Sequence, residues 1–168
     1  EIHEIGLAEV ERLHLAMEKI KTAVNFEGSL QDFFVFMRED DRFYFPNTDE
    51  GRQDYLNLNN EYLDAIPLKL PDYFGRLPKA QLEVRRVEYF REQTGAAQHY
   101  ASGTPDGSRP GVFYSHMSDM STLPIFQLED VAYHEGSPGH HMQISIQQEL
   151  TGVPRFRTQY RNTAYTEG

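Results

Sequence analysis

The hydrophobic and polar positions along the first part of the chain predict three amphipathic helices. Over residues 3–24, apolar residues recur at helical spacing, with Glu and Lys on the opposite face. A second helix is predicted at 30–38, after the capping residue Ser29, and a third at 48–63, which begins with a capping threonine. Prolines follow the third helix and end it. Residues 1–73 are therefore expected to form a helical region.

The pattern changes after residue 73. A small antiparallel sheet is predicted from three short segments rich in β-forming residues, at 82–87, 98–101 and 111–115. A long helix is predicted at 124–150, interrupted at 136–139, and a last helix is expected to start at Pro154 and to run to the end of the chain. The predicted fold class is α+β, mainly α-helical. We expect a single domain over residues 1–168, with the sheet and the later helices at 74–168.

Composition narrows the classes of protein. The net charge of −10 argues against a nucleic-acid partner, which favours a basic face. The three arginines at 155, 157 and 161 are interpreted as a solvated helix face. Cysteine is absent, so disulfides and thiolate metal ligands are excluded. No apolar run reaches the roughly 18 residues of a membrane-spanning helix. These features indicate a folded globular chain and leave its oligomeric state open.

Residues 134–141, with the sequence HEGSPGHH, carry the clearest chemical signal. Catalytic zinc is held by neutral imidazoles and carboxylates about 2 Å away, with one position left for water. Hydrolysis also needs a carboxylate beside that water. The usual helical pattern, His-Glu-x-x-His, places two imidazoles one turn apart on one face. Here two extra residues precede the next histidine, and the insert Gly-Ser-Pro-Gly predicts a break that brings it back toward the first.

We predict that His134 and His140 are metal ligands and that Glu135 is the general base. His141 is the alternative second ligand. In an unbroken helix, His134 and His140 would point to different faces, whereas His141 would share a face with His134 about two turns away. The spacing alone does not decide between His140 and His141. Exposed imidazoles at a helix terminus are the alternative to a metal site.

The third ligand is expected to be Glu167. Two antiparallel helices joined at 151–154 would bring Glu167 back beside the histidine segment, because Glu167 and His140 each lie roughly 11–14 residues from that turn. A His, His, Glu set is a known catalytic zinc arrangement. For Glu167 taken alone, a solvated glutamate is an equal alternative.

Several other residues are weaker candidates. Arg109 has the planar guanidinium that binds a substrate carboxylate, although a surface role is more common. The strand at 111–114 is expected either to pair with an extended peptide substrate or to be an ordinary edge strand. His99 and His116 are expected to be exposed to solvent. The tyrosines considered for stabilising an oxyanion are Tyr114, Tyr160 and Tyr165.

Four stretches carry a resemblance to a known family: FGRLPKA at 74–80, DGSRPGVFY at 106–114, the histidine segment at 134–143 and TEG at 166–168. With the preceding helical region, the whole chain resembles the bacterial proteins grouped as domain of unknown function 885. That family is placed among zincin-like metallopeptidases of the gluzincin type. Its members are much longer, so we expect this chain to be a piece of a longer protein that lacks part of the cleft wall. Whether the piece alone is active and holds zinc is left open.

The resemblance implies a zincin-like pair of active-site helices and a zinc site of His134, His140 or His141, and Glu167, with Glu135 as the base. It also implies a bacterial envelope or secreted location, with any signal segment outside this chain. The expected function is zinc-dependent hydrolysis of a peptide substrate. The alternatives are a non-catalytic module that binds peptides or cell-wall fragments, a helical domain without a site, and a metallohydrolase of amides or esters.

Overall fold

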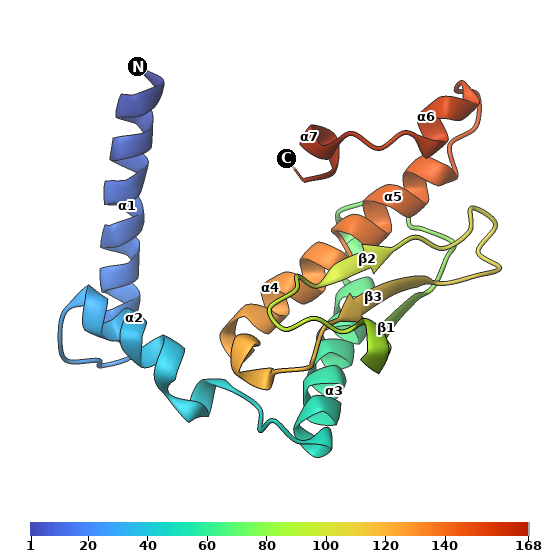
Figure 1. Cartoon of the computed structure of the whole chain (residues 1–168). Helices are drawn as coiled ribbons and strands as arrows, with labels where there is room; N and C mark the ends of the chain where they lie inside the picture. The colour runs from blue at the N-terminus through green and yellow to red at the C-terminus, as the bar shows by residue number, and fades with distance from the viewer. Residues whose placement is uncertain (168) are drawn as a thin grey trace. The chain divides into compact units, whose positions relative to one another are not determined.

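The computed structural model describes residues 1–167 (Figure 1), so Gly168, the last residue of the TEG stretch, lies outside the described residues. The chain divides into two compact units, residues 1–43 and residues 44 onward. None of the described helices is long and apolar enough to cross a membrane. The candidate site lies entirely in the second unit.

The first unit is a pair of helices, α1 (Ile2–Ala23) and α2 (Leu30–Glu39), followed by a 3₁₀ turn at Asp41–Phe43. The predicted cap at Ser29 is confirmed, because its hydroxyl accepts a hydrogen bond from the backbone N–H of Asp32 at 3.1 Å. The Asp32 carboxylate accepts in return from the backbone N–H of Ser29 at 2.9 Å. This reciprocal pair satisfies two donors that a helix start otherwise leaves free.

The second unit begins with helix α3 (Asp49–Ala65), where Thr48 is the predicted cap and accepts from the backbone N–H of Gly51 at 3.1 Å. Helices α4 (Ile125–Glu135) and α5 (His140–Gln148) form the predicted interrupted helix. Helix α3 packs against α4, and two apolar clusters join them to the sheet and its loops. The second cluster brings Leu63, Phe113 and Ala132 together, one residue from each of α3, the sheet and α4. The remaining 3₁₀ turns are at Ile66–Leu68, Leu70–Asp72, Tyr89–Arg91 and Met120–Thr122.

The sheet has three strands, β1 (Leu82–Arg86), β2 (His99–Ala101) and β3 (Gly111–Ser115), in the order β1-β3-β2. β2 is antiparallel to β3, but β1 is parallel to β3. The prediction of a purely antiparallel sheet is therefore wrong. The chain reverses direction twice between β1 and β3, and β3 enters between the other two strands. Local patterns identify strands, but they do not determine which strands become neighbours.

The end of the chain also differs from the prediction. Instead of one helix from Pro154, there are two short helices, α6 (Arg155–Gln159) and α7 (Thr163–Thr166). Tyr160 has an extended backbone, which ends α6, and the side chain of Asn162 caps α7 by accepting from the backbone N–H of Ala164 at 3.0 Å. An Asn side chain competes with helical hydrogen bonds in this way, so the second helix starts anew.

Candidate metal centre

The break between α4 and α5 places two histidines beside each other. The backbone N–H of Gly139 donates to the carbonyl of Tyr133 at 3.0 Å, and that of His141 donates to the carbonyl of Gly136 at 3.0 Å. A Cβ at Gly139 would overlap the backbone oxygens of His134 and Tyr133. Only glycine allows so close an approach of one helix start to the end of the previous helix. The helix-breaking insert thus acts as predicted.

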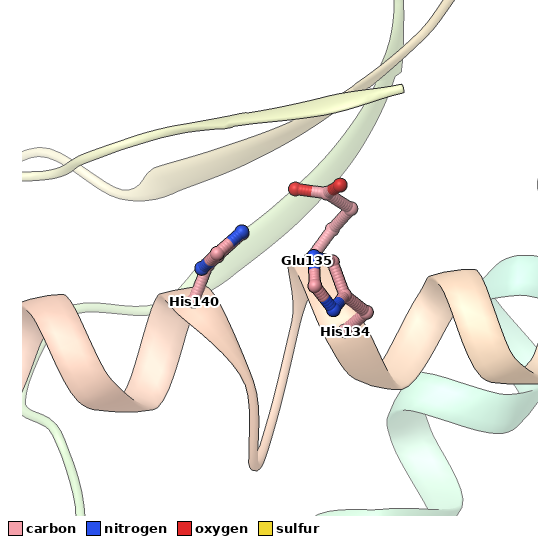
Figure 2. Close-up of side chains that lie close together, drawn as sticks. All are labelled: His134, Glu135 and His140. Atoms are coloured by element: carbon pink, nitrogen blue, oxygen red, sulfur yellow. The ribbon is translucent and has the colours of Figure 1, made fainter. Parts of the chain in front are cut away.

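His134, Glu135 and His140 form a compact cluster at this break. One ligand atom of each lies within 4.8 Å of the others, and the two imidazole ring centroids are 4.5 Å apart. Figure 2 shows the carboxylate of Glu135 and the ring of His140 projecting from the two helix ends toward the same side, where the strands pass. The His140 side chain is only 11% exposed, whereas that of His134 is 53% exposed.

Glu167 completes a possible ligand set. Its Oε2 lies 3.5 Å from Nε2 of His134, and its Oε1 lies 3.4 Å from Nε2 of His140. Two glutamines of α5 hold the segment that returns Glu167 to this place. Gln143 donates to the carbonyl of Tyr165 at 2.9 Å, and Gln147 donates to that of Tyr160 at 2.8 Å. The reason for the proximity is therefore this tethered segment rather than the long antiparallel helix that we expected.

His141 lies in a different environment from His140. It is 3% exposed, and its Nδ1 is 3.0 Å from the hydroxyl of Tyr100. The cluster of potential ligands contains His140 and not His141, among the residues that the structure describes. The geometry therefore favours His140 over His141 as the second ligand. His141 instead joins the start of α5 to the buried side of β2.

Burial controls the charge of Glu135. Burial of its side chain raises the pKa to about 7, and the nearby negative charge of Glu167 contributes to the rise. A backbone hydrogen bond from Tyr100 partly opposes it. Its Oε2 is buried and has no hydrogen-bond partner among the described residues. A carboxyl with this pKa accepts and releases a proton near neutral pH, as general acid–base catalysis requires.

The imidazole of His140 is favoured in its neutral form. Burial lowers its pKa from the ordinary range, the negative charge of Glu167 opposes this, and the charges of His134 and Arg161 lower it further. A neutral imidazole has the lone pair that a metal ion needs. His140 therefore has both the position and the protonation state that a metal ligand needs.

The donor set fits a zinc ion in its dimensions. Zinc bonds of about 2.0–2.1 Å in a tetrahedron place neighbouring ligand atoms roughly 3.3 Å apart. The two nitrogen–oxygen separations around Glu167, 3.5 and 3.4 Å, lie close to this distance. Two nitrogens and one carboxylate oxygen leave a fourth tetrahedral position for water. The two separations involve different oxygens of Glu167, so His134, His140 and Glu167 could hold zinc once a single carboxylate oxygen turns toward both imidazoles.

The cluster opens into a cavity of about 350 Å³. Besides the cluster and Glu167, it is lined by Ala97, Gln98, His99, Tyr100, Ile144, Arg161 and Thr166. His99 is half-buried and lines this cavity, so the expectation that it is simply exposed to solvent is wrong. Arg161 is exposed, as expected, but it lies in the turn between α6 and α7, where it lines the cavity, rather than on a helix face. Sequence reasoning missed both, because β2 and the turn after α6 bring them to the cavity only in the folded chain.

The weaker candidates lie elsewhere. Tyr114 stacks on His99, with ring centroids 5.4 Å apart, and Arg109 donates its backbone N–H to Thr104 at 2.9 Å. Neither lines the cavity, within the part of the chain that the structure describes. Tyr160 and Tyr165 line a separate pocket. β3, which was expected to be a possible edge, is the central strand, and β2 is the edge strand beside the cavity.

The fold and the site define a mainly helical α+β protein with a His, Glu, His cluster at the junction of two helices. The chain belongs to the family described as "Bacterial protein of unknown function (DUF885)", whose model matches residues 1–168. It is similar to a protein described as "the putative lipoprotein from Colwellia psychrerythraea", with 32% identity and a TM-score of 0.89. That similarity covers 99% of this chain and 28% of the other. No curated protein matched the chain.

Proposed function

We propose that this chain carries the catalytic centre of a zinc-dependent metallopeptidase. The observation that supports this most strongly is the position of the Glu167 carboxylate, within 3.5 Å of the imidazoles of both His134 and His140. A zinc ion bound there would polarise a substrate carbonyl and lower the pKa of a water molecule. The buried carboxyl of Glu135 lies in the same cavity and is placed to receive the proton of that water.

Each residue has a defined role in this proposal. His134, His140 and Glu167 are the metal ligands. Glu135 accepts a proton from the attacking water and then donates it to the leaving amine. In the metal-free chain its pKa is raised to about 7, so this carboxyl both takes up and releases a proton near neutral pH.

An extended peptide suits the cavity. β2 is the edge strand of the sheet and contributes His99 and Tyr100 to the cavity wall. A free strand edge binds an extended peptide through main-chain hydrogen bonds, without regard to its side chains. A peptide paired there would pass across the cluster. An envelope location also belongs to the proposal, since the similar protein from Colwellia psychrerythraea is described as a "putative lipoprotein".

The test is hydrolysis of a mixture of unstructured peptides by the zinc-loaded chain, followed by mass spectrometry. We expect cleavage by the parent chain and a loss of at least about 10³-fold in the Glu135→Gln variant, which loses the general base but keeps the three ligands. Glu61→Gln, the same change at an exposed glutamate of α3, is the control and should leave the activity unchanged. Zinc binding without hydrolysis would favour the alternative of a non-catalytic peptide-binding module. Equal activity in Glu135→Gln would overturn the mechanism.

A further inference from the structure

The cavity contains one basic side chain whose charge the metal centre does not use. Arg161 lines the cavity together with His140 and Glu167. It lies in the turn between α6 and α7, on the segment that the glutamines of α5 hold in place. Arg157, on α6, lines a different pocket.

The guanidinium of Arg161 is oriented by a hydrogen bond but forms no ion pair with a described carboxylate. Its Nη2 donates to the hydroxyl of Ser102 at 3.0 Å, just after β2. No carboxylate among residues 1–167 lies within 4.0 Å of it. A guanidinium has five N–H donors in a fixed planar fork, so a single bond to a neutral hydroxyl leaves donors for a ligand. The Ser102 contact fixes the direction of the fork and leaves its positive charge available.

The charge balance of the cavity favours an anion at this position. A zinc ion would bring two positive charges, against at most two carboxylates in the lining, those of Glu135 and Glu167. Arg161 adds a further positive charge that none of these carboxylates pairs within 4.0 Å. Arg binds a carboxylate through two parallel hydrogen bonds, which adds direction to the charge attraction. A neutral stretch of peptide would form no such pair and would leave the exposed guanidinium to water.

We propose that Arg161 binds a carboxylate of the peptide substrate and so makes the site selective for acidic peptides or for peptide C-termini. This proposal rests on the proposed peptidase function, which it refines. Ser102 is a positioning residue for the guanidinium. The carboxylate belongs either to the C-terminus of the peptide, which would make the enzyme a carboxypeptidase, or to an Asp or Glu side chain near the cleaved bond.

The test measures peptide binding rather than turnover. Isothermal titration calorimetry on the Glu135→Gln chain, with zinc and again after chelation, would use three peptides that differ only in the carboxylate they carry. The first has a free C-terminus, the second has a C-terminal amide, and the third has the amide and one internal Glu. We expect the chain to bind at least one carboxylate peptide about tenfold or more tightly than the neutral amide. Preference for the first or the third peptide identifies the source of the carboxylate.

Substitutions at Arg161 then identify the residue responsible. Arg161→Met should remove the preference, Arg161→Lys should keep part of it, and Arg157→Met should leave it unchanged. Equal binding of the three peptides by the Glu135→Gln chain, no binding of any, or an unchanged preference when Arg161→Met is added to it would overturn the proposal. Failure of the proposed peptidase function would give a different result. The Glu135→Gln chain would still prefer a carboxylate peptide, but the parent chain, which has Glu135, would cleave none of the three peptides.

Discussion

The imidazole rings of His134 and His140 lie 4.5 Å apart although they belong to different helices. The two rings meet because α4 ends at Glu135 and α5 begins at His140, with the backbone of Gly139 packed against the last carbonyls of α4. A regular helix would point these residues to different faces. The interruption is thus the feature that forms the candidate metal centre.

The first prediction concerns Gly139. In Gly139→Ala, the new Cβ would overlap the backbone oxygens of His134 and Tyr133, so the start of α5 must move. We expect a loss of about 1–3 kcal/mol in the free energy of unfolding and weaker zinc binding, because His140 moves with the helix. Chemical denaturation and competition with a zinc chelator would measure the two effects. Gly75→Ala is the matched control, since a Cβ there meets no atom within 4 Å; equal effects of the two variants would contradict this account of the break.

The second prediction concerns the pH dependence of stability in the zinc-free chain. Burial raises the pKa of Glu135 to about 7, from an ordinary value of 4.5. Between these values the folded chain binds more protons than the unfolded chain, so the free energy of unfolding falls as pH rises through this window. Glu135→Gln removes the buried charge. We expect it to gain about 2–3 kcal/mol of stability above pH 7 relative to the parent chain, and almost nothing near pH 4.5.

Urea denaturation at several pH values would measure this gain. Glu149→Gln is the control, because Glu149 is also buried but is well paired. Its carboxylate accepts from the backbone N–H of Lys79 at 2.8 Å and lies 3.3 Å from Arg76. This substitution should destabilise the chain instead of stabilising it. A parent chain whose stability does not fall between pH 4.5 and 7 would show that Glu135 is not desolvated as described.

The third prediction separates His140 from His141. Tyr100→Phe removes the hydroxyl that lies 3.0 Å from Nδ1 of His141 and leaves that nitrogen buried without its partner. We expect a cost of about 1–3 kcal/mol in the free energy of unfolding, with zinc content unchanged. His140→Gln should show the reverse, with loss of zinc and a smaller effect on the zinc-free fold. Zinc that survives in His140→Gln but is lost in His141→Gln would make His141 the ligand.

Local chemistry in the sequence was enough to predict the helices and their caps. Ser29 and Thr48 start α2 and α3 as expected, since a cap depends only on residues within one turn. The break at Gly136 to Gly139 was predictable for the same reason. The direction of β1 was not, because a parallel or antiparallel neighbour depends on how the chain returns.

The candidate site was predictable in its residue types and less so in its surroundings. The histidine segment identified His134, Glu135 and His140, but the choice of His140 over His141 needed the buried contact of His141 with Tyr100. Glu167 lies near both imidazoles for a reason that the sequence did not give, the tethering of its segment by Gln143 and Gln147. Arg161 reaches the cavity through the same segment. The spacing of the arginines at 155, 157 and 161 could not show this, because it depends on where the segment lies in the folded chain.

The most direct measurement is the zinc content of the purified chain by elemental analysis, after equilibration with zinc and removal of loosely bound ions. The proposal predicts about one zinc ion per chain, reduced to background in His134→Ala and in Glu167→Ala. His14→Ala, which removes an exposed histidine of the first unit, should leave the zinc content unchanged. Absence of zinc from the parent chain, or zinc that persists in His134→Ala, would contradict the central claim that His134, His140 and Glu167 form a metal centre.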